Sequence, residues 1–461
     1  MEQRSKQLTI LAAASLSSFL TAFMGSSVVI ALPSIAMYFS MDAVLINWVS
    51  TSYLIATAIF LLPLGRAADL LGRKRIFTTG IGVFTVMTLL APFAPDKWIF
   101  LALRALQGIG GAMIFSTGIA MLTAVYPQQD RGRVLGINVA TVYGGLTMGP
   151  VVGGFLASRC GWQSIFLVCV VLGIFVYTLV SLNVGKDPRS EHPARMDVAG
   201  SIIYCIFMVS LMLGFSWLPG PYGWLGLATG VLFFSVFIRF EISCASPVLD
   251  ITLLTRNRAF AFSNAAALIH YGATFSTGFL ISLYLQYVRG MSPEHAGLVM
   301  VIQPAVMSVL SPFAGILSDR IEPRLLASSG MAITASGLFS LSFIGPDTSI
   351  TFIIMVLAYL GSGFAMFSSP NTNAVMSSVD SHDYGVASGI LSTMRVTGQA
   401  FSMGLTLMLF SIIIGRVRIT PEVLPAFMTA CRTGLALFAL LCIPGIAASL
   451  ARGDLRNRHQ V

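Results

Sequence analysis

Long apolar runs recur along the whole chain of 461 residues, and they constrain its fold more than any other feature. Fourteen runs of roughly 20 residues follow one another, which is about the length that a helix needs to cross a bilayer. They cover approximately 8–37, 46–64, 76–94, 98–124, 134–157, 162–184, 197–217, 222–240, 259–287, 296–316, 325–344, 350–375, 386–414 and 426–450. Because only 10% of the residues are charged, against about 25% in an ordinary soluble domain, we exclude a soluble enzyme, a nucleic-acid-binding module and a disordered scaffold.

The pattern within the runs predicts helices rather than a barrel, because no strand-like alternation of apolar and polar residues recurs. A helix also satisfies its own backbone hydrogen bonds, as the lipid interior requires. We therefore expect an all-α membrane protein. The first run follows Arg4 and Lys6, but it is too long for a signal peptide and is read as the first span. The six cysteines show no metal-ligand spacing, so neither a disulfide framework nor a metal site is expected.

An even number of spans places both termini on one side of the membrane, and the basic residues indicate which side. Of the 27 lysines and arginines, 19 fall on the side of the N-terminus, 6 on the other side and 2 within spans. This excess predicts that both termini are cytoplasmic. The net charge of +9 is then explained by topology, so we expect no nucleic-acid partner.

A short motif occurs twice, at equivalent places in the chain. The stretch Gly65-Arg66-Ala67-Ala68-Asp69 follows the second span, and Gly315-Ile316-Leu317-Ser318-Asp319-Arg320 follows the tenth. With spans seven and eight set aside, each motif follows the second span of a six-span half. The repeat predicts two pseudo-symmetric six-helix bundles, over 1–184 and 259–461, and two extra helices with their cytoplasmic connections over 185–258. Parallel halves of this kind are typical of transporters.

The first copy continues as Leu70-Leu71-Gly72-Arg73-Lys74-Arg75. Its small residues let two helix ends approach closely, and Asp69 can accept hydrogen bonds from a neighbouring helix N-terminus. Such a cluster can hold the two halves together and release when they move. The stretch resembles the signature loop of the major facilitator superfamily. The resemblance implies a gating motif made of Gly65, Asp69, Gly72, Arg73 and Lys74, with Asp319 and Arg320 in the second copy.

Two further stretches are similar to motifs of the same superfamily. Arg104-Ala105-Leu106-Gln107-Gly108 lies in the fourth span, and the fifth span carries the glycine-rich stretch that marks exporters, the antiporter motif. Its residues are Gly145, Gly149, Pro150, Gly153 and Gly154. The glycines permit close helix contact and the proline bends the helix. With fourteen spans, and with Trp48 and Tyr53 in the second span, the chain resembles the drug:proton antiporter branch, which implies multidrug efflux.

One position departs from that branch. Its members commonly carry an aspartate in the first span, where this chain has Met24. All 18 acidic residues lie in loops or at span ends, so no carboxylate is expected near the membrane midplane. A cation in an apolar cavity needs a countercharge, and we therefore expect neutral or anionic substrates to be favoured over dications.

Three ionisable residues within spans, Arg104, His270 and Arg395, are candidates for coupling or for the cavity, because such residues are functional by default. Each also has a structural interpretation: Arg104 and Arg395 can bond within the fold, and a lone histidine is often a packed core residue. For His270 the functional alternative is proton carriage, given an ordinary pKa near 6.5. Further cavity candidates are Gln107, Tyr143, Gln303, Asn371, Asn373 and Gln399, together with Met24, Trp48 and Tyr53.

The sequence thus predicts a secondary active transporter, without enzymatic activity or cofactor, in the plasma (inner) membrane. We expect proton-coupled efflux of small amphipathic organic compounds by alternating access, with the small-molecule substrate, protons and the lipid bilayer as partners and a monomeric protein. Two alternatives stay open. One is a facilitator or importer of an anionic metabolite that uses Arg104 and Arg395, and the other is a transporter-like sensor that moves nothing.

Overall fold

The computed structural model describes residues 2–183, 197–244, 247, 249, 251–379 and 384–453, which are almost entirely helical and contain no strand. The first six long helices are α1 Glu2–Tyr38, α2 Ala43–Leu71, α3 Arg73–Leu90, α4 Lys97–Val125, α5 Gln128–Arg159 and α6 Gln163–Asn183. Two helices, α7 Val198–Trp217 and α8 Pro221–Ser243, form a hairpin, and the short α9 spans Ile251–Arg256.

The second half of the described chain begins with α10 Arg258–Leu283, which continues as a π-helical turn over Tyr284–Val288. It goes on with α11 Pro293–Met300, α12 Ile302–Arg320, α13 Pro323–Leu341, α14 Ile350–Ser377, α15 Tyr384–Leu409 and α16 Leu424–Ala451. A second π-helical turn over Phe410–Ile414 extends α15. The prediction of an all-α membrane protein is confirmed.

Thirteen of the segments among the described residues are long and apolar enough to cross a membrane. The run predicted over 325–344 is the one outside this set, and α13 occupies its place with 19 residues. This helix packs between α14 and α16 like its neighbours. The exact count of fourteen spans therefore stays a prediction.

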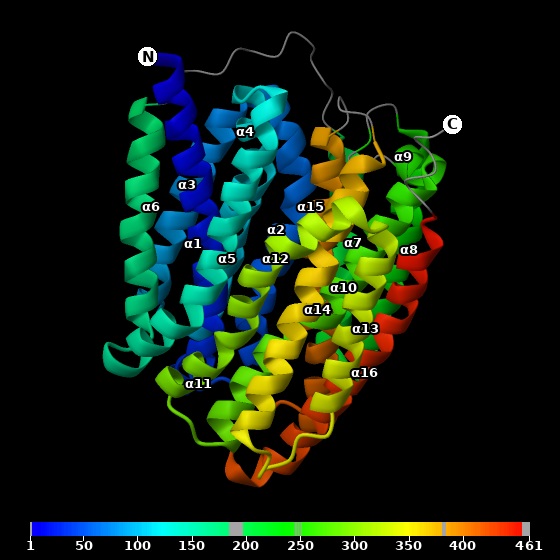
Figure 1. Cartoon of the computed structure of the whole chain (residues 1–461). Helices are drawn as coiled ribbons and strands as arrows, with labels where there is room; N and C mark the ends of the chain where they lie inside the picture. Colours follow the sequence, from blue (N-terminus) through cyan, green and yellow to red (C-terminus); the bar gives the residue numbers. More distant parts are fainter. Residues whose placement is uncertain are drawn as a thin grey trace.

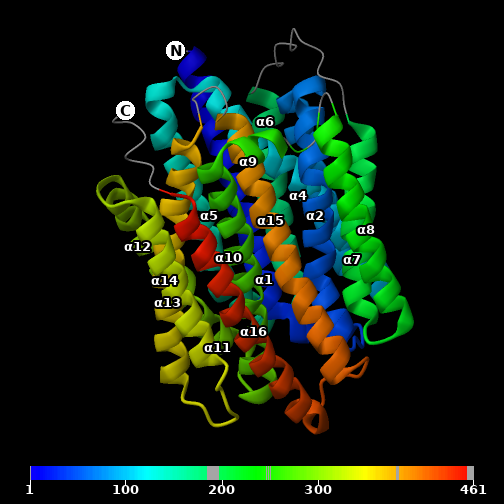
Figure 2. The same ribbon diagram turned by 90° about the vertical axis from the view of Figure 1, so that its right-hand side faces the viewer.

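The helices form two groups that lie side by side (Figures 1 and 2). Helices α1–α6 pack mainly against one another, and so do α10 and α12–α16, while α11, which belongs to the second group by its place in the chain, packs mainly against α5. We call these groups the N-bundle and the C-bundle, while the boundaries predicted at residues 184 and 258 stay predictions. Helix α1 begins and α16 ends on one face of the molecule, which we call the terminal face, and the other is the opposite face (Figures 1 and 2).

Helix α7 contacts both bundles. Trp48 Nε1 of α2 donates to Ser216 Oγ at 3.0 Å, and the hydroxyls of Tyr204 and Thr397 of α15 are 3.2 Å apart. The α7–α8 hairpin therefore lies along one edge of the boundary between the bundles, outside both of them.

Several carboxylates at span ends cap helices instead of entering the membrane. Asp42 accepts a hydrogen bond from the amide of Leu45 at the start of α2, at 2.8 Å. Asp96 does the same for α4, and Asp197 for α7. Because an N-cap satisfies amides that a helix leaves unbonded, these acids are held at the ends of the spans.

Helices α13 and α14 touch through glycine, and this contact yields a stability prediction. A Cβ at Gly330 would lie 2.6 Å from the backbone nitrogen of Phe367, so Gly330→Ala forces the helices apart. We expect a loss of about 1–3 kcal/mol, measured as a lower midpoint of thermal unfolding in detergent. The control is Gly389→Ala, since nothing lies within 4 Å of a Cβ there. An equal loss in both variants would contradict the predicted contact.

Candidate functional site

The gating motif lies on the terminal face, at the joint between α2 and α3. Gly72 has a φ of 101°, which favours glycine, and its amide bonds to Ala68 O at 3.0 Å. Asp69 Oδ1 forms an ion pair with Arg73 Nη2 at 3.1 Å, and 44% of the Asp69 side chain is exposed. Arg73 Nη1 also donates to Ala120 O of α4 at 3.2 Å. Asp69 thus forms its ion pair within its own bundle.

The neighbours of Asp69 connect α2 to α4 and to the segment after α8. A Cβ at Gly65 would lie 3.7 Å from Ser116 Cβ of α4, an ordinary contact. Arg66 Nη2 donates to Pro247 O at 3.1 Å. Lys74 lies in the first turn of α3, at the same face. The motif therefore joins the N-bundle to the connection between α8 and α9.

The second copy of the motif ends α12 on the terminal face. Arg320 is the last residue of α12, and the side chain of Asp319 lies outside the described part of the chain. Asn373 Nδ2 of α14 donates to Ser318 Oγ at 2.9 Å. Asn373 is therefore bonded to this copy of the motif, at the end of the C-bundle.

The antiporter motif packs α5 closely against α1. Its glycines Gly145, Gly149 and Gly153 all face that helix. A Cβ at Gly145 would lie 2.6 Å from Phe19 O, and one at Gly153 would lie 2.6 Å from Ser27 Cβ. Ser27 Oγ donates to the carbonyl of Gly149 at 3.0 Å. The glycines thus allow side chains of α1 to reach the α5 backbone.

The last part of the motif crosses to the other bundle. A Cβ at Gly154 would collide with the carbonyl oxygen of Pro293 at the start of α11. A Cβ at Gly297 of α11 would collide in turn with the carbonyl oxygen of Pro150. The four residues form a reciprocal contact between α5 and α11, which we call the α5–α11 contact.

Other bonds between the bundles lie on the same side as this contact. Arg159 Nε, at the end of α5, is 3.5 Å from Glu294 Oε2 of α11. Ser282 Oγ of α10 donates to Val29 O of α1 at 3.0 Å. These residues lie toward the opposite face, so the bundles are joined there, while Asp69 on the terminal face pairs within its own bundle.

Arg104 is held inside the N-bundle. Its side chain is 2% exposed, its Nε donates to Val49 O at 3.1 Å and its Nη1 donates to Gln107 Oε1. Gln107 Nε2 donates to Thr88 Oγ1 at 2.5 Å. The guanidinium carbon is also 5.0 Å from the ring centre of Tyr53. This network joins α2, α3 and α4, and the placement favours the structural interpretation of Arg104 and Gln107.

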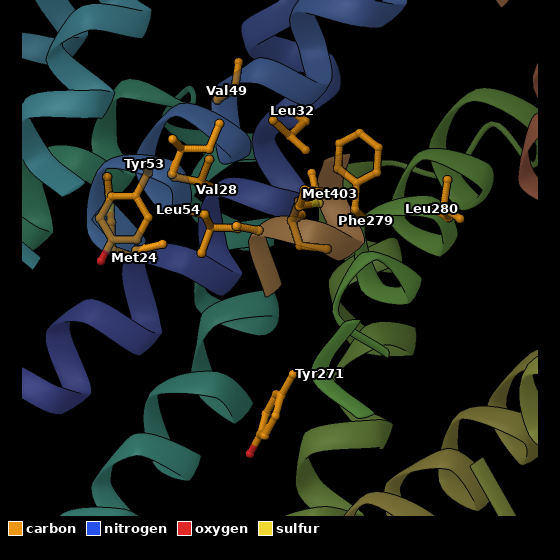
Figure 3. Close-up of a cluster of buried hydrophobic side chains, with 14 of the residues drawn as sticks. Met24, Val28, Leu32, Val49, Tyr53, Leu54, Tyr271, Phe279, Leu280 and Met403 are labelled. Atoms are coloured by element: carbon orange, nitrogen blue, oxygen red, sulfur yellow. The ribbon is translucent and has the colours of Figure 1, made fainter. Parts of the chain in front are cut away.

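Met24 occupies an apolar environment. The residue is 1% exposed and belongs to one buried cluster with Val28, Tyr53 and Leu54 (Figure 3). The charged side chain that adjoins this cluster is Arg104, whose guanidinium carbon is 5.0 Å from the ring centre of Tyr53. The thioether packs where the related branch carries an acid.

Arg395 lies about halfway along α15, where α15 faces α10 and α14. Its Nη2 donates to Thr372 Oγ1 at 2.7 Å, and its guanidinium carbon is 5.5 Å from the ring centre of Tyr271. The Tyr271 hydroxyl is 3.4 Å from Ser368 Oγ. Gln399 follows one turn later and is half-buried like Arg395. Unlike Arg104, Arg395 retains a buried Nε without an acceptor in the described chain.

His270 points into the C-bundle, away from polar partners. It is 0% exposed, and its ring stacks on Phe367 at 3.9 Å between centres. Neither ring nitrogen has a hydrogen-bond partner among the described residues. Phe364 lies 4.9 Å away, between ring centres. This environment favours a packed residue, whereas the adjacent Tyr271 lies beside Arg395.

Two other predicted cavity residues are engaged elsewhere. Trp48 bonds to Ser216 of α7, as described above. Asn371 is 2% exposed, donates to Ser263 O at 3.1 Å and accepts from Arg452 Nη1 at 3.1 Å. It therefore connects α10, α14 and the end of α16.

Sequence reasoning missed two features of this region. Gly297 was not singled out, because its contact joins helices from separate halves of the chain. Tyr271, which follows His270 in the sequence, was not predicted as a site residue, although its ring faces Arg395. Among the described residues, no three His, Cys, Asp or Glu side chains gather as a metal site would require.

Comparisons with known proteins agree with this arrangement. The chain is 26% identical to the riboflavin transporter RibZ of Clostridioides difficile, over 84% of each protein. It is 31% identical to the cephamycin export protein CmcT of Amycolatopsis lactamdurans, over 87% of this chain and 85% of that protein. The crystal structure of a bacterial homologue of the human lysosomal transporter Spinster, inward-facing and unoccupied, matches the fold with a TM-score of 0.68 at 18% identity, over 97% of each chain. The Major Facilitator Superfamily model matches residues 14–403, and the chain therefore belongs to that superfamily of membrane transporters.

Proposed function

We propose that this transporter is a proton-coupled exporter of small amphipathic organic compounds. The observation that carries the proposal is the α5–α11 contact, in which the antiporter motif closes the opposite face against the C-bundle. On the terminal face Asp69 pairs with Arg73 of its own bundle, so in this state Asp69 does not hold the two bundles together there. That face is the cytoplasmic one in our proposal, so this state receives substrate from inside the cell.

The transport cycle then requires one exchange of contacts. Bonds between the bundles on the opposite face break, and Asp69 leaves Arg73 to accept hydrogen bonds from a helix N-terminus of the C-bundle. A carboxylate is stabilised at such a helix end. Proton uptake drives the return, and His270 is the ionisable side chain within the spans whose ordinary pKa suits this step, since the arginines stay protonated.

Electrostatics sets the substrate preference that we propose. The cationic Arg395 lies within a span, whereas several acids cap helix ends and Met24 packs among apolar side chains. A buried cationic substrate needs a countercharge, so neutral or anionic compounds are favoured.

The runner-up is a facilitator or importer of an anionic metabolite. The similarity to a riboflavin transporter supports this alternative. The antiporter motif and the similarity to an export protein support export. Flux in oriented vesicles decides between them. We expect substrate to move from the terminal face to the opposite face against its gradient when the opposite face is acidified. Movement in the reverse direction under the same gradient would contradict export.

The gating motif gives a second prediction. Asp69→Asn should slow proton-driven export about tenfold, because the loss of a charge at a helix N-terminus costs about 1–2 kcal/mol in the state open to the opposite face. Substrate binding from the terminal face should persist. The matched control is Asp96→Asn, since asparagine caps a helix as well as aspartate does. Equal export by both variants would contradict the proposed role of Asp69.

The α5–α11 contact gives a third prediction. Gly297→Ala should prevent closure of the opposite face, because the added methyl collides with Pro150. We expect a cysteine placed at the buried Ser282 to react several-fold faster with a membrane-impermeant thiol reagent from that face, in a background without native cysteines. The control Gly136→Ala has nothing within 4 Å of the added methyl and should leave the rate unchanged. An unchanged reaction rate in the Gly297→Ala variant would contradict the proposal that the α5–α11 contact closes the opposite face.

A further inference from the structure

The guanidinium of Arg395 is positioned but incompletely bonded. Thr372 holds Nη2 at 2.7 Å, and the ring of Tyr271 lies 5.5 Å from the guanidinium carbon. These two contacts fix the plane of the group from α14 and α10. Nε is buried and has no acceptor in the described chain. Because a buried donor without an acceptor is costly, the site is better satisfied when a further acceptor is present.

No carboxylate of the described residues pairs with Arg395. Two ion pairs of the described residues, Arg73 with Asp69 and Arg159 with Glu294, instead lie at the ends of helices. In a structural ion pair the partner charge is part of the fold. Arg395 has no such partner among the described residues. Its planar fork matches a carboxylate, with which it forms two parallel charge-assisted hydrogen bonds.

Aromatic side chains adjoin the cation on the side of the N-bundle. The Tyr271 ring extends from α10, apart from the apolar cluster around Met24 (Figure 3). Its edge-to-face neighbour Phe364 lies 5.5 Å away between ring centres. One cation bordered by aromatic rings suits a ligand with one acidic group on a flat apolar body.

Arg104 does not provide a second charge to this site. Its Nε and Nη1 are bonded to Val49 and Gln107, and its side chain is 2% exposed within the N-bundle. A dianion would therefore leave one carboxylate without a countercharge at membrane depth, which is unfavourable.

We propose that the site beside Arg395 selects aromatic monocarboxylates, with the carboxylate paired to Arg395 and the ring against Tyr271. This inference rests on the proposed export function and narrows it to one substrate class. Arg395 is thus the residue that determines specificity for an acid over its neutral analogue.

Equilibrium binding to the purified protein tests the inference independently of transport. The probes are naphthoate, its neutral amide naphthamide and a naphthalene dicarboxylate, with the change in tryptophan fluorescence as the readout. We expect wild-type protein to bind naphthoate at least about tenfold more tightly than the amide or the dicarboxylate. Arg395→Gln should remove the preference for the acid, while amide binding changes less than about threefold. Arg395→Lys keeps the charge and should retain part of the preference for the acid.

The control is Lys97→Gln, which removes one positive charge at the start of α4 on the opposite face. It should keep the preference of the wild type. Equal affinity of the wild type for acid and amide, or an equal loss of both in Arg395→Gln, would overturn the inference. Proton-driven flux of the same probes in vesicles is measured separately. A protein that binds the acid selectively but moves neither probe would contradict the export function and leave the assigned specificity standing.

Discussion

The approach of α5 to two helices at once determines how the bundles can meet. Between lipid-exposed helices the hydrophobic effect contributes little, so close packing of small residues supplies the attraction. Gly145, Gly149 and Gly153 let α5 lie against α1 within its own bundle, and Gly154 lets it lie against α11 of the other. One helix therefore takes part both in packing inside a bundle and in contact between the bundles.

Charge is arranged to complement this packing. Carboxylates such as Asp42 and Asp96 stay at helix ends as caps, and the gating pair Asp69–Arg73 lies exposed on the terminal face. Within the spans the two arginines have different environments. Arg104 is enclosed by acceptors from its own bundle, while Arg395 keeps donors beside aromatic rings. The first bonds within the fold, whereas we propose that the second pairs with a ligand, a difference that residue type alone does not reveal.

Sequence reasoning succeeded where the signal was local or periodic. Apolar runs of membrane length predicted the helices, and ordered motifs predicted the superfamily, because each depends on neighbouring residues. It could not assign Arg104 and His270, because their roles depend on side chains from other helices: Gln107 and Thr88 for the arginine, and Phe367 for the histidine. The run over 325–344 shows a related limit. Helix α13 is long enough to cross a membrane, but its serines and glycines lower its apolarity, so it falls outside the set of apolar spans.

The account as a whole depends on the two bundles pivoting about a shared site, with closure alternating between the faces. Distances between spin labels on the two faces test this most directly, in protein without its six native cysteines. One pair replaces the exposed Phe93 and Phe343 on the opposite face, and the other replaces the exposed Leu71 and Ile321 on the terminal face. On acidification in lipid nanodiscs, proton uptake favours the return to the state open to the terminal face, so the account predicts that the first distance shortens while the second lengthens. Two distances that stay constant, or that change in the same direction, would contradict it.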